Sequence, residues 1–224
     1  MQAISLKMRS GEKILSSALN KFAPKIAIAW SGGKDSTALL HIIRSLNNGK
    51  VPIPVLFIDS GLHFPETLEF VNKLEHAWNL NLVRVDDKAT LRQFRASKSR
   101  LKKKELANLM LVRGIKKSVK KFRWRALVVG IRWDEHEARA SEAYFSVRKK
   151  HTRIHPILHF SERDIWEYIS SRGIPHHPLY DQGYRSIGER PFTKPVTDPR
   201  ASERSGRENE NVKIMVKLRA QGYF

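Results

Sequence analysis

The stretch KIAIAWSGGKDS, residues 25–36, joins a short run of β-favouring residues to a loop that contains two glycines. Residues 36–47 follow, and they place Leu39, Ile43 and Leu46 at helical spacing. The stretch therefore predicts a strand, a tight turn and an amphipathic helix, which together form the first half of a βαβ unit.

The loop of this unit, residues 31–36, combines several features that bind phosphate. Its glycines let a ligand approach backbone N–H groups, and the helix that follows points the positive end of its dipole at the same place. The loop matches neither the Walker A spacing nor the Rossmann spacing of glycines. A strand–helix turn without a ligand is the alternative. We predict that a phosphate or pyrophosphate is bound by Ser31, Gly32, Gly33, Lys34, Asp35 and Ser36.

Further strands are expected at residues 55–59, 80–85 and 126–130, and helices at residues 12–23 and 65–79. Because strands alternate with helices, we predict an α/β fold with a doubly wound, mostly parallel sheet and helices on both faces.

Length and composition favour one domain spanning residues 1–224, with 41% hydrophobic residues to build its core. We expect residues 174–224 to form an irregular C-terminal segment that ends in a short helix at 211–221. The N-terminus has no secretory signal and no apolar run is long enough to span a membrane, so we expect a cytoplasmic protein without a membrane partner.

The net charge of +20 predicts an anionic partner, and most of it lies in residues 92–125. Fourteen Lys or Arg residues stand there against one acidic residue, Glu105. We interpret this segment as a basic helical insertion. Three alternatives remain: a solvated helix, a surface for an acidic protein, or a nucleic-acid (RNA) surface on which Phe122 and Trp124 could stack with bases.

SGGKDS after a strand resembles the PP-loop of the N-type ATP pyrophosphatases. The segment DSGLHFPET at 59–67 is similar to one in the phosphoadenosine phosphosulfate (PAPS) reductase and ATP sulfurylase small-subunit family, as are GIRWDE at 130–135 and IPHHPLYD at 174–181. The resemblance implies an adenine nucleotide alpha hydrolase-like fold that binds ATP or a related adenine nucleotide with Mg²⁺. It implies Lys34 and Arg132 as catalytic residues. It adds to the nucleotide-binding set Asp59, Gly61, Gly130, Arg132 and Arg139.

Residues 183–195 depart from the pattern of the iron–sulfur reductases in that family. Glu189 and Phe192 stand where those reductases carry two cysteines, and the 224 residues contain no cysteine at all. Glu and Phe cannot hold an iron–sulfur cluster together, and a hydroxyl cannot replace an attacking thiol. We therefore expect no cluster and no thiol-dependent reduction, and we predict no metal site built from side chains.

Two features favour the ATP sulfurylase branch: Asp134 and Glu135 followed by Arg139, and the chain end GYF at 222–224. The resulting prediction is a nucleotidyltransferase of sulfate assimilation that transfers an adenylyl group to sulfate and releases pyrophosphate, with a GTPase as a possible partner subunit. The alternatives are a PP-loop protein that acts on RNA or tRNA, a degenerate reductase relative that binds a sulfonucleotide without reducing it, and a nucleotide-binding module without chemistry.

Overall fold

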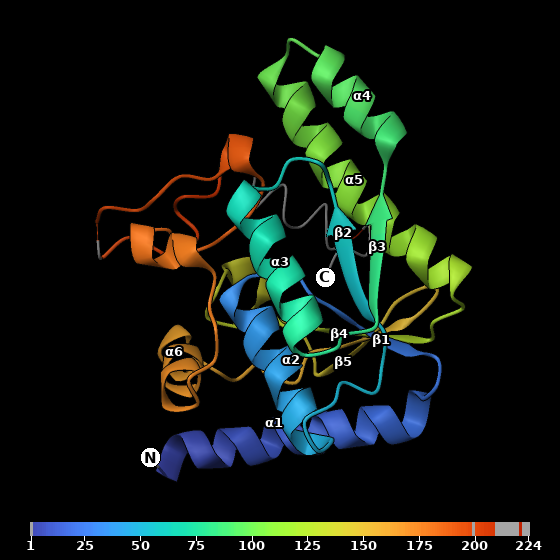
Figure 1. The fold of residues 1–224 in the computed structure, drawn as a ribbon, viewed down its shortest axis with the longest axis vertical. Coiled ribbons are helices and arrows are strands. Elements are labelled where there is room, and N and C mark those ends of the chain that lie inside the picture. The colour runs from blue at the N-terminus through green and yellow to red at the C-terminus, as the bar shows by residue number, and fades with distance from the viewer. Residues whose placement is uncertain (1, 199, 209–219, 221–224) are drawn as a thin grey trace.

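The computed structural model describes residues 2–198, 200–208 and 220, and its centre is a six-stranded sheet (Figure 1). The strand order is β3-β2-β1-β4-β6-β5. All neighbouring strands are parallel except β5 and β6, which are antiparallel. The strands are β1 (Ile26–Ala29), β2 (Val55–Asp59), β3 (Leu82–Asp86), β4 (Ala126–Val129), β5 (Phe145–Val147) and β6 (Thr152–Ile154).

Helices surround this sheet, and four of the six named next connect its parallel strands. They are α1 (Gln2–Phe22), α2 (Lys34–Leu46), α3 (Pro65–Ala77), α4 (Lys88–Ala96), α5 (Arg100–Lys121) and α6 (Glu162–Ser171). Three short 3₁₀ helices lie within irregular segments of the chain, at Glu137–Arg139, Pro178–Gln182 and Arg190–Phe192. Among the described residues, no helix combines the length and the apolarity needed to cross a membrane.

The two faces of the sheet are covered unequally. Alternate strand residues such as Ile26, Ile28 and Phe57 join the largest hydrophobic cluster with side chains of α1, α2, α3 and α6. The intervening residues Ala27 and Leu56 face a smaller cluster that includes Ile115 and Val119 of α5. Helices on both faces confirm the predicted doubly wound α/β fold. Among the described residues, the helical members of the second cluster come from α5.

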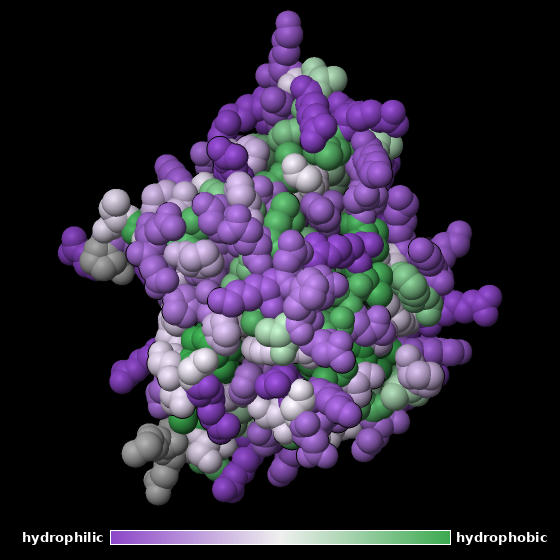
Figure 2. Space-filling model, in the orientation of Figure 1, coloured by the Kyte–Doolittle hydropathy of each residue, from purple (hydrophilic) through white to green (hydrophobic). Residues whose placement is uncertain are grey.

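Helix α5 lies close against the sheet at one glycine. A Cβ added to Gly114 would lie 2.8 Å from Cγ2 of Ile58 on β2, so only a residue without a side chain fits there. Towards the loop that joins them, α4 and α5 project beyond the sheet, and the projecting end carries hydrophilic side chains (Figures 1 and 2). Residues 92–125 thus form the end of α4, the whole of α5 and the turns around them.

Some elements differ from the prediction. The first helix begins at Gln2 rather than at residue 12. Strands β5 and β6 were not predicted because each has only three residues, FSV and TRI, too few to show an alternating pattern. The helix predicted at 211–221 lies outside the described residues except for residue 220.

Three histidines, two buried and one half-buried, are expected to make the stability of the fold depend on pH. Burial lowers the pKa of His151, His155 and His177 to about 4, below the ordinary value of 6.5. As the pH falls from 6.5 to about 4, these histidines become protonated in the unfolded chain but stay neutral in the folded protein, which favours the unfolded state. We predict that the free energy of unfolding is highest above this window and falls through it, as measured by urea denaturation at several pH values.

The matched control for this prediction is His76, which is exposed. The variant His155→Gln should flatten the pH dependence between pH 6.5 and about 4, whereas His76→Gln should leave it as in the unmodified chain. An equal flattening by both variants would contradict the assignment to buried imidazoles.

Candidate anion-binding site at the PP-loop

The loop at 31–36 lies where β1 ends and α2 begins, at the carboxyl ends of the parallel strands (Figure 1). In open α/β sheets this edge is where ligands bind. Gly130, directly after β4, sets the spacing there. A Cβ on Gly130 would lie 3.0 Å from the carbonyl oxygen of Asp35, so the end of β4 packs directly on the first turn of α2.

Polar groups from two parts of the chain hold the loop in shape. The Oγ of Ser36 accepts from the backbone N–H of Ser31 at 3.2 Å and donates to the carbonyl of Gly33 at 3.1 Å. Gly33 precedes α2 without a side-chain cap, and the N–H of Lys34 donates to the hydroxyl of Tyr180 at 2.8 Å. A ligand that takes this N–H must therefore displace the Tyr180 hydroxyl.

Two buried cations hold one carboxylate in front of the loop. The side chains of Lys34 and Arg132 are 1% and 0% exposed, and both are bonded to Glu203. Arg132 also binds Asp35 and, at 3.0 Å, Asp134. Although burial lowers the pKa of the Arg132 guanidinium, the charges of Glu203 and then Glu135 raise it above its ordinary value. Arg132 therefore stays charged, and the pair forms a cradle for a negatively charged group.

A second ion-pair group lies beside the cradle. Glu135 is bonded to Arg139, four residues later, and to Arg204. Burial raises the pKa of the Glu135 carboxyl, but Arg139 and then Arg204 outweigh it and hold that pKa well below its ordinary range. Arg139 thus neutralises Glu135 in this structure.

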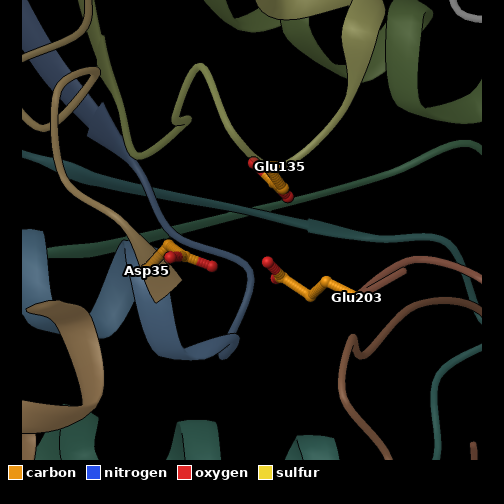
Figure 3. A group of neighbouring side chains, drawn as sticks. All are labelled: Asp35, Glu135 and Glu203. Atoms are coloured by element: carbon orange, nitrogen blue, oxygen red, sulfur yellow. The ribbon is translucent and has the colours of Figure 1, made fainter. Parts of the chain in front are cut away.

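The carboxylates of Asp35, Glu135 and Glu203 converge from three parts of the chain (Figure 3). One oxygen from each lies within 4.8 Å of the others, and oxygen donors of this kind suit Mg²⁺. Each carboxylate is, however, already paired with a lysine or an arginine. In this arrangement the three form an ion-pair network, and the set does not fit a metal ion. The expected Mg²⁺ remains a prediction.

Glu203 and Arg204 belong to residues 193–198 and 200–208, which we call the C-terminal strap. An antiparallel bridge between Thr193 and Arg207 turns the strap back on itself. The guanidinium of Arg185 donates to the carbonyl of Ala201 at 2.5 Å, and Arg207 donates to the carbonyl of Ile187 at 2.8 Å. These contacts place Glu203 over the loop.

The remaining space at the loop is a cavity of about 190 Å³. Pockets for small organic ligands usually measure about 300–1,000 Å³, so an adenine nucleotide needs more room than this conformation provides. Of the residues predicted to bind nucleotide, those that line the cavity are Ser31, Gly33, Lys34, Asp35, Ser36, Gly130 and Arg139.

Four residues of the predicted set do not line this cavity: Gly32, Asp59, Gly61 and Arg132. Arg132 is buried behind it and contacts Glu203. The carboxylate of Asp59 accepts from the N–H of Gly61 at 2.9 Å, which shapes the turn after β2. Gly61 has a φ of +67°, a conformation that favours glycine.

Sequence reasoning missed Glu203, Arg204, Arg207 and Tyr180 as parts of the site. The first three lie in an irregular stretch whose fold-back depends on long-range contacts, so no local pattern marks them. Tyr180 belongs to the segment IPHHPLYD, and its neighbour His177 has a structural role. The Nδ1 of His177 accepts from the N–H of Leu179 at 3.2 Å, and its Nε2 lies 2.8 Å from the hydroxyl of Thr67.

A mostly parallel sheet with a glycine-containing loop between β1 and α2 defines a PP-loop protein with the adenine nucleotide alpha hydrolase-like fold. Residues 25–195 match the family model of the phosphoadenosine phosphosulfate reductase domain, and the chain belongs to this family.

Named relatives agree with this family. The chain is 29% identical over 204 residues to an adenosine 5′-phosphosulfate reductase of Geobacillus kaustophilus, covering 87% of this chain and 83% of the relative. It is 28% identical over 199 residues to a phosphoadenosine 5′-phosphosulfate reductase of Xylella fastidiosa, covering 86% and 83%. These relatives are named as enzymes.

Two solved structures share the fold. One is the PAPS reductase of Candida auris in a phosphate complex, with a TM-score of 0.70, 21% identity, and coverage of 87% of this chain and 97% of that chain. The other is the FMN adenylyltransferase of Candida glabrata in complex with ATP, with a TM-score of 0.69, 19% identity, and coverage of 98% and 80%.

The prediction of an adenylyltransferase that uses sulfate as acceptor is wrong, because the family model and these relatives are named for sulfonucleotide reduction. The motif that favoured it, Asp134 and Glu135 followed by Arg139, does not distinguish adenylyl transfer from sulfonucleotide reduction. Glu135 and Arg139 are bonded to each other, so they build the frame of the site in this structure. The second feature, the GYF end at 222–224, lies outside the described residues.

Proposed function

We propose that the PP-loop site binds a sulfated adenine nucleotide of the adenosine 5′-phosphosulfate type, and that the thiol for its reduction does not come from these 224 residues. The observation that carries this proposal is the carboxylate of Glu203 held between Lys34 and Arg132. A group with one negative charge and two oxygens occupies the place that a phosphate or sulfate of the ligand would take.

The rest of the site supports an adenine nucleotide. Apolar side chains of Ala29, Ile58 and Val129 line the cavity beside the loop, where they suit a purine ring. The relatives are named for sulfonucleotides, and one structural neighbour was solved with ATP. These ligands share an adenosine 5′-phosphate, so that part is the common recognition element of our proposal. We assign Lys34 and Arg132 to its charged groups.

The absence of cysteine separates binding from reduction. In thiol-dependent reduction a thiolate attacks the sulfur, and none of the 224 residues can supply one. This chain would accordingly hold the sulfonucleotide. A thiolate of another molecule would attack its sulfur and form an S–S bond, while the S–O bond to the phosphate breaks and the adenosine phosphate leaves. A second thiol of that molecule would then form a disulfide and release sulfite.

Isothermal titration calorimetry with the full chain tests the proposal. We expect adenosine 5′-phosphosulfate and its 3′-phosphorylated form to bind more tightly than AMP, and GTP not to bind. Lys34→Gln should lower the binding affinity for the sulfonucleotide by about 10-fold or more, because a hydrogen bond to a charged group contributes about 1.5–3 kcal/mol. Binding of ATP without binding of either sulfonucleotide would refute the assignment. Sulfite release by this chain in the absence of any added thiol would also refute it.

A further inference from the structure

A second and larger hollow lies on the α5 side of the sheet, away from the PP-loop. Its volume is about 1130 Å³, against about 190 Å³ at the loop. Its lining comes from the second half of α5 and from the turn between β5 and β6. The acidic residues Asp87 and Glu137, together with Ala138, Ser141 and Ala220, complete it. We call it the basic groove, because eight of its lining residues are basic: Arg113, Lys116, Lys117, Lys120, Arg148, Lys149, Lys150 and His151.

The α5 wall is basic because of helical spacing. Arg113, Lys116, Lys117 and Lys120 follow the i, i+3, i+4, i+7 pattern, which places them along one stripe of the helix. The hydrophobic face of the same helix, which includes Ile115, is buried against the sheet. The sheet therefore fixes the orientation of the stripe, and the stripe faces out of the core.

Much of the positive charge in this groove is not neutralised by the described part of the chain. Arg113 lies 3.7 Å from Asp87, and Arg148 lies 3.0 Å from Glu142. The groove has five lysines: Lys116, Lys117, Lys120, Lys149 and Lys150. None of them forms an ion pair with any residue in 2–198, 200–208 or 220.

The other lysine cluster of α5 differs. Lys102 lies 3.6 Å from Glu105, and Lys104 lies 3.6 Å from Glu208. The ammonium of Lys103 lies over the ring of Phe94, 5.4 Å from its centroid. This cluster, at the projecting end of the helix, is therefore engaged within the chain, whereas the charge in the groove is available to a partner.

The groove is also lined by a histidine that has one ring nitrogen without a hydrogen-bond partner among the described residues, and by exposed apolar surface. The Nε2 of His151 is buried and has no hydrogen-bond partner among the described residues. Val147, on the rim, is 81% exposed. Phe122 lies two residues beyond Lys120, outside the lining of the groove, and is 37% exposed. Its ring stacks on Trp124 with the ring centroids 4.9 Å apart, and the ammonium of Lys121 lies 5.2 Å from its centroid.

From these features we propose that the basic groove binds the sugar–phosphate backbone of a single-stranded nucleic acid. The lysines of α5 and of the turn between β5 and β6 match a chain of phosphates, and the exposed aromatic surface of Phe122, close to Lys120 in the chain, offers a contact for a base. An acidic peptide would match the charges but has less use for the aromatic surface at Phe122, so the nucleic acid is favoured. This site does not depend on the ligand of the PP-loop.

Fluorescence anisotropy with labelled RNA and DNA strands of about 12 nucleotides tests the proposal, at salt concentrations from about 50 to 200 mM. We expect both strands to bind, since the groove recognises the shared backbone, and a preference for one would identify the natural source. The groove variant replaces Lys116, Lys120, Lys149 and Lys150 with glutamine. It should lose about 10-fold or more in affinity, and the slope of log K against log salt should shrink by up to about 3, at about 0.7 per lost phosphate contact.

The matched control removes the same charge elsewhere, at four exposed lysines of α1, α3 and a loop: Lys13, Lys21, Lys50 and Lys73. It should retain wild-type affinity within about twofold, and replacing Lys102, Lys103 and Lys104 should cost less than the groove variant. An equal loss with groove and control variants would overturn the proposal, because net charge alone would then explain binding. Tighter, groove-dependent binding of labelled polyglutamate would overturn it in favour of an acidic protein.

Discussion

Glu203→Gln is expected to raise the affinity of the PP-loop site for a sulfated adenine nucleotide by about 10- to 100-fold. Without the carboxylate, the ligand no longer has to break a charged hydrogen bond, and each such bond contributes about 1.5–3 kcal/mol. In the unmodified chain, the ligand must first remove the Glu203 carboxylate from Lys34 and Arg132. An amide keeps the size of the side chain but not its charge.

The same substitution should lower the stability of the ligand-free protein. Removing one partner of a buried ion pair leaves the other charge uncompensated, at a cost of about 3–5 kcal/mol. The side chains of Lys34, Arg132 and Glu203 are all less than 10% exposed, so this cost applies here. Thermal unfolding with and without nucleotide measures both effects. Compared with the unmodified chain, the variant should have a lower Tm without ligand and a larger rise in Tm when ligand is added.

Glu208 provides the control on the same strap. It lies 2.6 Å from Arg100 in an ion pair on the surface, away from Lys34 and Arg132. Glu208→Gln changes the charge equally, and we expect it to leave nucleotide affinity and Tm nearly unchanged, because surface pairs contribute at most about 1 kcal/mol. Weaker nucleotide binding by Glu203→Gln would show that Glu203 assists the ligand rather than occupying its place.

The same comparison bears on how the strap opens. The cavity of about 190 Å³ lies beneath residues that the strap positions, including Arg204. Ion pairs, a single bridge and a few hydrogen bonds hold the strap. Because its described residues form no sheet strand and no α-helix, its displacement leaves the sheet intact. Binding is therefore expected to exchange one anion for another within a preformed pair of cations.

The amino-acid sequence predicts the central strands and the loop well, because their signals are local. Val55–Asp59 is a run of β-favouring residues, and it forms β2 with the predicted bounds. Lys34 could be found in the same way, from its place between two glycines and a helix.

Long-range contacts explain what the sequence does not reveal. Glu203 is 169 residues from Lys34, and no period or motif connects the two. The basic groove is similar in this respect, since Lys149 and Lys150 meet the stripe of α5 only because β5 and β6 form the edge of the sheet. The charge of residues 92–125 was visible in the sequence, but the division into an engaged half and an available half was not.

Arg132→Lys is expected to weaken nucleotide binding by about 10- to 100-fold although it preserves the charge, since lost charged hydrogen bonds are worth about 1.5–3 kcal/mol each. The planar guanidinium of Arg132 reaches three carboxylates at once, on Asp35, Asp134 and Glu203. A lysine has one ammonium group on a flexible chain and cannot reproduce this fork. Calorimetry at a temperature where circular dichroism shows the variant to be folded measures the loss.

Arg84→Lys is the matched control. Arg84 on β3 contacts Glu75 at 2.5 Å on the surface, so we expect the exchange there to leave nucleotide affinity unchanged. Combining Arg132→Lys with Glu203→Gln closes a double-mutant cycle. If Glu203 and the ligand compete for the same guanidinium, the gain from Glu203→Gln should shrink when Arg132 is already replaced. Full additivity of the two changes would mean that Glu203 and the nucleotide do not share Arg132, and would refute the exchange of anions at this cradle.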